Sequence, residues 1–172
     1  MNALFLERFQ IVEASPAALL DAAATTGDFV SLKHAVRAVV VFVSGVGTAG
    51  DDPVLSLFQA QDVSGTGVQD LNPPSNSTFQ KQAATDLSAV AAWTDASGDI
   101  SANDVTNATA AEQSLIWVVE IRPDELDVDD GYDCIRADVN DVGTNAQPGY
   151  LFYIIELKEQ RAPANAVSVI AD

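Results

Sequence analysis

Residues 115–158 read LIWVVEIRPDELDVDDGYDCIRADVNDVGTNAQPGYLFYIIELK, and this stretch decides the fold class. It holds three runs of seven or eight residues, rich in β-branched and aromatic side chains: Leu115–Ile121, Tyr132–Val139 and Tyr150–Leu157. Segments rich in Asp, Gly, Asn and Pro separate the runs, and such segments form turns. Runs of this length between turns predict one antiparallel sheet, in preference to helices or alternating strand–helix units.

Further strands are expected before this stretch. The run Arg37–Val43 is almost continuously apolar, which predicts a strand buried on both faces. Other predicted strands are Phe29–Leu32, Val54–Ala60 and, more weakly, Val68–Leu71. The chain is therefore predicted to be mainly β: an antiparallel, jelly-roll-like β-sandwich with at most one or two short helices.

Helix signals are confined to two places. Ser15–Ala24 has a Ser cap, Pro at the first helical position and good helix formers, so it predicts a short helix. It is short enough for a tertiary contact to hold it extended instead. Phe79–Ala92 fits either a short helix or a strand.

The 172 residues fit a single domain that can bury a core without disulfides or metals. Residues 1–13 are predicted to be an extended N-terminal segment, and charge interrupts their apolar residues too early for a signal peptide. Residues 94–113 are polar and aperiodic, which predicts an exposed loop. Residues 159–172 form a predicted C-terminal arm, whose end either adds to a neighbour's sheet edge or frays.

Acidic residues dominate the charge, because 25 Asp and Glu against 8 Lys and Arg give a formal net charge of −17. Such a surface repels phosphate, so nucleic acid is excluded as a partner, and anionic membranes are repelled as well. No apolar run approaches the roughly 20 residues that span a bilayer. The charge favours solubility and keeps copies apart outside their intended contacts. Lys33, His34 and Arg37 form a basic spot on this acidic body, a plausible docking point.

Two motif matches lack the context that their chemistry needs. Gly45–Gly50 matches G-x-G-x-x-G, but the carboxylates of Asp51 and Asp52 and then Pro53 follow where a dinucleotide site needs a helix N-terminus. The glycines are instead expected to supply positive φ in a hairpin connection.

The second match is the acidic turn between Asp127 and Asp138. Asp127, Asp129, Asp133 and Asp138 stand at positions 1, 3, 7 and 12 of a possible calcium loop. Positions 5 and 6 carry Gly131 and Tyr132 in place of a ligand and a glycine, so a solvated turn is favoured. A calcium site of another geometry stays open.

No catalytic set is expected. His34 is the only histidine and Cys134 the only cysteine, so histidine-based metal sites and internal disulfides are absent. Cys134 is expected to be a small buried apolar side chain. No G-x-S-x-G motif occurs, and carboxylate pairs are frequent only because the chain is acidic. The sequence predicts neither an enzyme nor a cofactor.

Several turn segments resemble those of small virion proteins of tailed bacteriophages, which are encoded among head genes. The resemblance covers most of residues 28–156 and rests on DFVSLKHA (28–35), GTAGDDP (47–53), QAQDVSGTG (59–67), AAEQ (110–113), ELDVDDGY (125–132) and DVNDVGTNAQ (138–147). These segments consist mainly of turn-forming residues and contain no catalytic motif. The chain departs from that group at its end, where Lys158–Pro163 replaces an Arg-Tyr-Pro-like element.

The resemblance implies a capsid decoration (cement) protein, made in the host cytoplasm, that binds the major capsid protein on the outer surface of the head, often as a homotrimer. We expect residues 1–13, the basic spot and the arm to reach the shell, and exposed tyrosines to join the copies. The expected capsid contacts are Phe5, Arg8, Phe9, Lys33, His34, Arg37 and Arg161, and the expected oligomer contacts are Tyr150 and Tyr153.

Two alternatives remain open. A neck or tail component would share the same structural character. A carbohydrate-binding sandwich would use Trp93, Trp117 or Tyr132 as stacking platforms, although Trp117 lies in an apolar run and is expected in the core.

Overall fold

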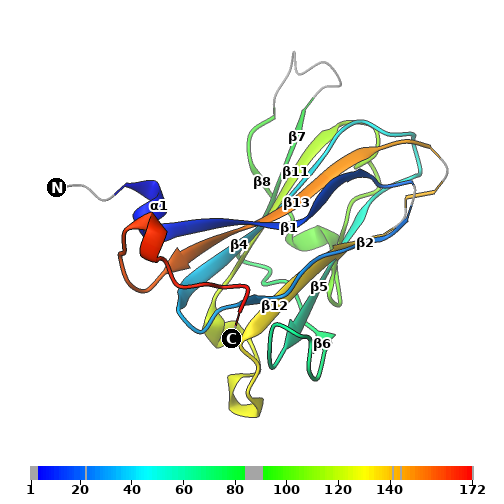
Figure 1. Ribbon diagram of the computed structural model, residues 1–172. Helices are drawn as coiled ribbons and strands as arrows, with labels where there is room; N and C mark the ends of the chain where they lie inside the picture. Colours follow the sequence, from blue (N-terminus) through cyan, green and yellow to red (C-terminus); the bar gives the residue numbers. More distant parts are fainter. Residues whose placement is uncertain (1–3, 22, 84–90, 141, 144, 172) are drawn as a thin grey trace.

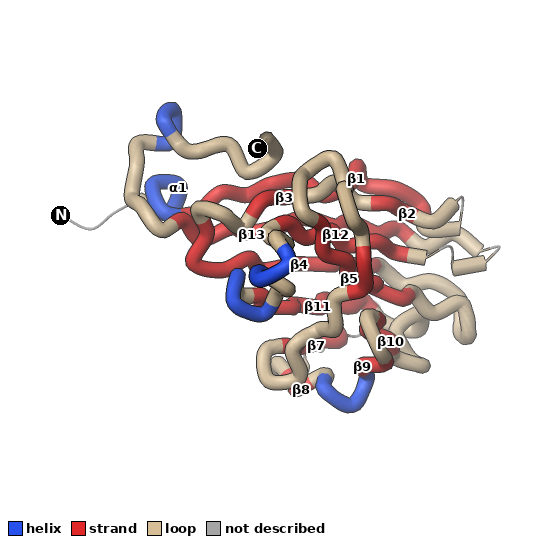
Figure 2. Tube along the Cα trace, turned by 90° about the horizontal axis from the view of Figure 1, so that it is seen from below, coloured by secondary structure: helices blue, strands red, loops and turns tan. Residues whose placement is uncertain are grey.

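The computed structural model describes residues 4–21, 23–83, 91–140, 142–143 and 145–171. Two antiparallel sheets pack against each other, which confirms the predicted β-sandwich (Figures 1 and 2). In sheet A the strand order is β1-β13-β4-β11-β7-β8, and in sheet B it is β2-β12-β5-β10-β9, with β3 on β12 and β6 on β5.

The strands of sheet A are β1 (Phe9–Leu19), β4 (Ala35–Ser44), β7 (Thr78–Ala83), β8 (Thr94–Asp95), β11 (Ser114–Ile121) and β13 (Pro148–Leu157). Those of sheet B are β2 (Thr25–Thr26), β3 (Val30–Ser31), β5 (Val54–Ala60), β6 (Gln69–Asp70), β9 (Ile100–Ser101), β10 (Asp104–Thr106) and β12 (Cys134–Val139). The helical turns are α1 (Phe5–Arg8), η1 (Ser97–Asp99), η2 (Pro123–Glu125), η3 (Val128–Asp130) and η4 (Pro163–Asn165). Among the described residues, no helix is long and apolar enough to span a membrane.

The core lies between the sheets, where alternate residues of each strand meet. Trp117 of β11 and Phe42 of β4 are fully buried, with ring centroids 5.6 Å apart. Leu57 and Ile135 belong to the same buried cluster from sheet B. Burying each such side chain contributes about 1.5–3 kcal/mol to folding, so this layer accounts for the sandwich. Cys134 is buried, as predicted.

The three runs that decide the fold class are all strands, but they do not share one sheet. Strands β11 and β13 lie on either side of β4 in sheet A, whereas β12 pairs with β5 in sheet B. The connection through η2 and η3 carries the chain from one sheet to the other. Turn chemistry shows where a strand ends, but it does not show which sheet the next strand joins.

The predicted helix at Ser15–Ala24 is wrong. Strand β1 continues to Leu19 and pairs with β13, with register shifts on both sides of Ser15. Pro16 lies at this irregularity, where a missing N–H costs no ladder hydrogen bond. Leu20 follows the strand with its side chain in the core and its N–H donating to Gln147 O at 2.8 Å. Long-range pairing and burial therefore override the local helix signal.

The two segments expected at the N-terminus and at residues 94–113 also differ from prediction. Residues 5–8 form the single turn α1, and the extended chain begins only at Phe9; residues 1–3 lie outside the described residues. The expected loop at 94–113 holds β8, β9 and β10, and Val105 of β10 is fully buried. An apolar residue every few positions is enough to add short strands to an existing sheet.

The C-terminal arm folds back onto its own domain. Ser31 N donates to Val169 O at 2.7 Å, and Val169 is only 3% exposed. The arm therefore closes part of the gap between β1 and β3 in its own chain, and it neither frays nor extends away at Val169. Of the ambiguous Phe79–Ala92, residues up to Ala83 form strand β7, and residues 84–90 lie outside the described residues.

Tyr153 is a core residue, so its predicted role as an oligomer contact is wrong. Its hydroxyl accepts a hydrogen bond from Ala137 N at 2.9 Å and donates to Asp28 O at 3.1 Å, which links sheet A to sheet B. Burial raises the pKa of the Tyr153 hydroxyl. Tyr150, two positions earlier, lies on the opposite face of β13, and its hydroxyl donates to Glu13 at 3.2 Å.

We expect Tyr153→Phe to lower the free energy of unfolding by about 1–3 kcal/mol, because Ala137 N–H would stay buried without a partner. Tyr150→Phe removes the same atom from an exposed hydrogen bond and should cost less than about 0.5 kcal/mol. Urea unfolding of both variants measures the difference, and equal losses would contradict the bridging role.

Candidate functional site

Most of the side chains expected to contact a partner come together at one end of the sandwich. Figures 1 and 2 show α1 and the C-terminal arm side by side beyond this end. Arg161 N donates to Glu7 O at 3.0 Å, and Gln160 Nε2 donates to Glu7 Oε2 at 2.8 Å. Lys158 N donates to His34 O at 2.9 Å, which attaches the segment before β4.

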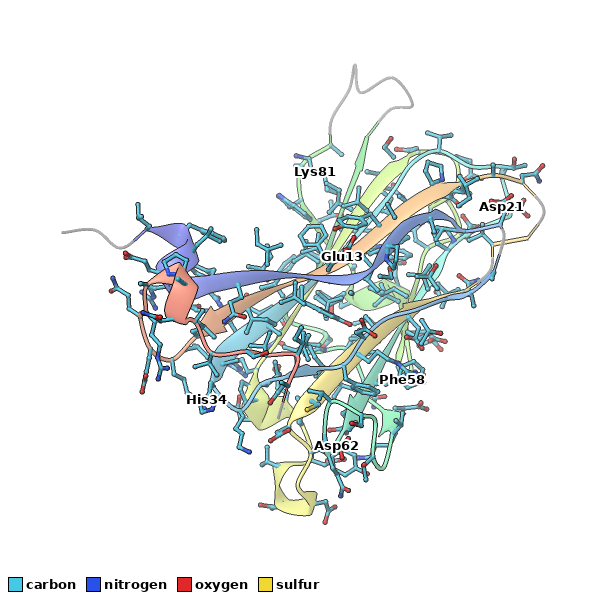
Figure 3. All side chains as sticks on the ribbon, viewed as in Figure 1. Glu13, Asp21, His34, Phe58, Asp62 and Lys81 are labelled. Atoms are coloured by element: carbon cyan, nitrogen blue, oxygen red, sulfur yellow. The ribbon has the colours of Figure 1, made fainter. Side chains whose placement is uncertain are left out.

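We call this region the basic end. It holds six of the chain's nine Lys, Arg and His side chains: Arg8, Lys33, His34, Arg37, Lys158 and Arg161. They come from three separate parts of the sequence, so only folding brings them together. Figure 3 labels His34, which lies at this end.

Glu156 organises the arginines of the basic end. It is only 8% exposed, and its two oxygens bind Arg8 Nη2 at 2.7 Å and Arg37 Nε at 2.8 Å. Arg37 Nη1 also binds Glu120 Oε1 at 3.0 Å. The hydrogen bond to Glu120, with help from Glu156, raises the pKa of Arg37 further. Arg37 is therefore a partly neutralised positioning group, and it adds less to the basic spot than the sequence suggests.

Outside the Glu156 cluster, the basic end carries four exposed basic side chains: Lys33, His34, Lys158 and Arg161. Lys158 Nζ donates to Lys33 O at 3.0 Å, and Arg161 pairs with Glu159 at 2.6 Å. This hydrogen bond from Arg161 lowers the pKa of Glu159. The Arg161–Glu159 pair is exposed and therefore weak, so Arg161 can exchange Glu159 for a carboxylate of a partner.

An apolar projection stands beside these charges. Leu4, Phe5 and Leu6, which we call the α1 knob, are each about half exposed or more, with Phe5 at 51%. The ring of Phe5 stacks on Phe9, with centroids 4.6 Å apart. Exposed apolar side chains grouped on one small projection are typical of a contact surface. Sequence reasoning found Phe5 and Phe9 but missed Leu4, Leu6 and Lys158, although the first two flank Phe5 directly.

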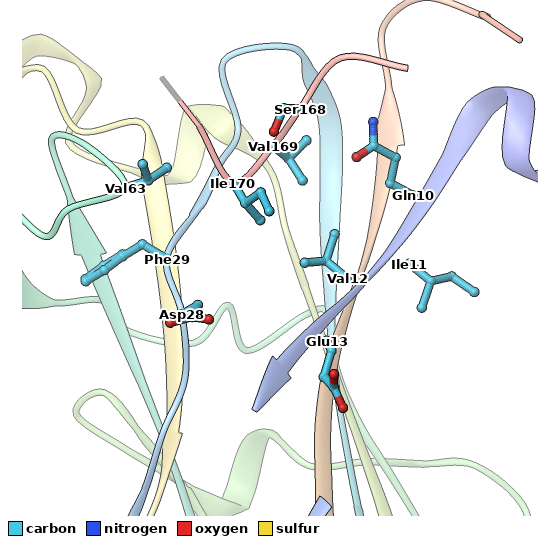
Figure 4. A pocket seen from close by; sticks show the side chains of 10 residues that line it. All are labelled: Gln10, Ile11, Val12, Glu13, Asp28, Phe29, Val63, Ser168, Val169 and Ile170. Atoms are coloured by element: carbon cyan, nitrogen blue, oxygen red, sulfur yellow. The ribbon is translucent and has the colours of Figure 1, made fainter. Parts of the chain in front are cut away.

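A groove of about 610 Å³ runs between β1 and the segment before β3 (Figure 4). Its walls carry Val12 and Glu13 on one side and Asp28 and Phe29 on the other, and the arm lies along its upper part at Val169. Its lining has no histidine, cysteine, lysine or arginine. The groove is the open flank of the sandwich, and its lining offers no paired nucleophile and base.

The carboxylates of the acidic turn lie apart and bind different partners. The Asp127 carboxylate accepts hydrogen bonds from the side chains of Gln59, at 3.0 Å, and Gln69. Asp138 lies near the far end of β12, where it accepts from Gly27 N at 3.0 Å and pairs with Arg136 at 2.9 Å. Within the described ranges, no three Asp, Glu, His or Cys side chains are grouped to hold a metal ion.

The glycine-rich segment between β4 and β5 crosses from sheet A to sheet B, so the predicted hairpin is wrong. Only Gly50 of its three glycines has positive φ. A Cβ on Gly45 would lie 2.8 Å from Pro148, and one on Gly47 would lie 2.9 Å from Gln147. The two glycines therefore allow their backbone to approach residues 147 and 148 closely. Their N–H groups donate to backbone oxygens, which leaves neither for a phosphate.

The three aromatic residues considered as carbohydrate platforms do not share a surface. Trp117 is fully buried, as expected. Trp93 is exposed beside β8 of sheet A, with Lys81 Nζ 5.8 Å from its ring centroid. Tyr132 precedes β12 of sheet B, and its hydroxyl donates to Gly67 O at 2.7 Å.

No family model matches this chain, and no curated protein or solved structure matches it either.

We expect Glu156→Gln to lower the free energy of unfolding by about 2 kcal/mol, because two arginines lose their shared and largely buried counter-charge. Asp124→Asn is the matched control. Its exposed carboxylate pairs at 3.5 Å with the exposed Arg122, and the change should cost less than about 0.5 kcal/mol. Chemical unfolding of both variants compares them, and an equal effect would show that Glu156 has no organising role.

The pKa of Asp138 is raised, chiefly by burial. Protonation of Asp138 therefore favours the folded state, and this contribution is lost as the pH rises through the raised pKa. Wild type should gain stability relative to Asp138→Asn as the pH falls from neutral towards the ordinary carboxyl pKa of 3.8. Urea unfolding of both proteins at each pH tests this, and a gap that shrinks on acidification would contradict it.

Proposed function

We propose that this protein is a structural component of a phage virion, a decoration protein that binds the outer surface of the capsid protein lattice and stabilises the head. The basic end and the α1 knob form the docking surface. The sandwich stands on the shell through them and performs no chemistry.

The convergence of the basic end carries this proposal. Segments near residues 5–9, 33–37 and 158–161 were expected to touch a shell for separate reasons, and backbone hydrogen bonds such as Arg161 N to Glu7 O join them into one surface. Phe5, Arg8 and Arg161 are exposed, and aromatic and arginine side chains are enriched at protein interfaces. The resemblance of the turn segments to small virion proteins supplies the identity of the partner.

Charge supports the same reading. A net charge of −17 keeps copies dispersed before they meet a lattice. Collecting five of the eight Lys and Arg residues at one end makes this end less negative than the rest of the molecule, which orients its approach to an acidic surface. Modest single contacts become strong when one molecule touches several subunits, because each further contact forms at a high effective concentration.

The direct test mixes the purified protein with head shells that lack it, and then measures saturation stoichiometry and resistance of the shells to heat. Saturable binding with improved heat resistance is expected. Binding to purified tails or necks instead of heads would contradict decoration and favour the other virion positions. Absence of binding to any virion part would overturn the proposal.

Phe5→Asp should weaken shell binding about tenfold or more, because a charge replaces an apolar contact at the docking surface. Val128→Asp is the matched control. The exposed fraction of Val128, 53%, is similar to that of Phe5, but Val128 lies on η3, away from α1 (Figure 1). Co-sedimentation with shells measures both affinities. If Val128→Asp weakens binding as much as Phe5→Asp, the docking surface lies elsewhere.

A further inference from the structure

Two adjoining pockets lie within the basic end. The first, which we call the Arg161 pocket, has a volume of about 70 Å³ and is lined by His34, Lys158, Glu159 and Arg161, with two apolar residues. The second, which we call the Lys33 pocket, has a volume of about 260 Å³, and its lining includes Lys33 and His34. Because His34 lines both, the two pockets are neighbours. A single water needs about 10–15 Å³, so each pocket has room for a carboxylate group.

The charge of these two pockets is opposite to that of the whole chain. Acidic residues outnumber Lys and Arg by 25 to 8 in the sequence. The described residues that line the two pockets include four basic side chains, whereas Glu159 is the one carboxylate among them. Basic side chains attract an anion and offer it charge-assisted N–H donors. The pockets therefore suit an anionic group that comes from outside the chain.

Backbone contacts hold the walls of the pockets together. Lys158 N donates to His34 O at 2.9 Å, which joins the end of β13 to the segment before β4. Lys158 Nζ donates to Lys33 O at 3.0 Å, so its ammonium group lies beside the backbone of Lys33. Arg161 N donates to Glu7 O at 3.0 Å, which attaches the arm to α1. None of these contacts uses the carboxylate of Glu159, so its removal should leave the pockets in place.

Glu159 already supplies a carboxylate to Arg161. Arg161 Nε donates to Glu159 Oε2 at 3.1 Å, and Arg161 Nη2 donates to the same oxygen at 2.6 Å. The edge of a guanidinium can instead bind both oxygens of a carboxylate through two parallel hydrogen bonds, which is the stronger geometry. The side chain of Glu159 is 70% exposed, so water competes for this pair. An incoming carboxylate that binds through both oxygens can therefore displace Glu159.

We propose that the Arg161 pocket binds a carboxylate from an acidic segment of the partner protein, and that Glu159 competes with this carboxylate for Arg161. A second carboxylate of the same segment occupies the Lys33 pocket, beside Lys33 and His34. This proposal deepens the proposed function and rests on it for the identity of the partner.

The arrangement of the cations favours an acidic segment over other anions. One phosphate group contacts one pocket, whereas successive acidic side chains place a carboxylate in each of the two. A net charge of −17 repels long polyanions such as nucleic acid. Competition by Glu159 lowers the apparent affinity by the fraction of molecules in which it occupies Arg161. Because an exposed pair is weak, this reduction should be only several-fold.

The single histidine allows a direct test, because its ring protons report on both pockets without overlap from another histidine. The full chain is titrated at constant pH with a tetraglutamate peptide whose two ends are capped, and the His34 signals are followed by NMR. Saturable shifts are expected. Arg161→Gln should weaken binding about tenfold, because it removes a charge-assisted pair. Inorganic phosphate at the same concentration should shift the signals less than the peptide does.

Glu159→Gln separates competition from a merely structural role, because only a competitor makes binding tighter when it is removed. This variant should bind the peptide several-fold more tightly than wild type. Asp95→Asn is the matched control, since it removes the same charge from an exposed carboxylate on β8, at the opposite edge of sheet A from β1. It should change the affinity less than about twofold, because distant exposed charges are screened. In the Arg161→Gln background, Glu159→Gln should have no larger effect than Asp95→Asn.

Four outcomes would overturn the proposal: no saturable shift, unchanged binding in Arg161→Gln, equal effects of Glu159→Gln and Asp95→Asn, or phosphate binding as tight as that of the peptide. The peptide titration uses no shells, so it is independent of the first test of the proposed function. Loss of shell binding with intact peptide binding would contradict only the proposed function. Circular dichroism checks that each variant keeps its strands.

Discussion

The packing of sheet A on sheet B around Trp117 and Phe42 is the contact on which the rest of the structure depends. Side chains alternate along a strand, so burying one parity of β4, β11 and β13 assigns the other parity to the exterior. The same constraint that fills the core with Trp117 and Tyr153 turns Val41, Val118 and Phe152 outward. Which side chains face outward on sheet A is therefore a direct consequence of how the core is built.

The core also determines where the chain ends meet. Strand β1 pairs with β13, and β13 pairs with β4, so the start of β1, the start of β4 and the end of β13 lie at one end of sheet A. Glu156 stands at this junction and holds Arg8 and Arg37. Because the arm follows β13, its hydrogen bond to Glu7 completes the basic end.

The candidate site was partly visible in the sequence. Phe5, Phe9, Lys33 and His34 could be selected as residues that suit contact, because an acidic chain has few cations and its N-terminus is apolar. Their meeting at one end was not predictable from spacing, since it depends on pairings between β1, β4 and β13 that join residues more than one hundred positions apart.

Sequence alone was enough for the properties that arise from local periodicity and composition: strands at Leu115–Ile121 and Tyr150–Leu157, a β-sandwich, a buried Cys134 and a strongly acidic surface. Tertiary structure decided the properties that need a long-range partner. Pairing with β13 holds the residues after Ser15 in strand β1, although their sequence favours a helix. The tertiary structure also places β12 in the opposite sheet from β11 and β13, and it turns Tyr153 inward, where its hydroxyl bridges the two sheets. A period of two identifies a strand, but neither its sheet nor its buried side, because both are set by the strands that pack against it.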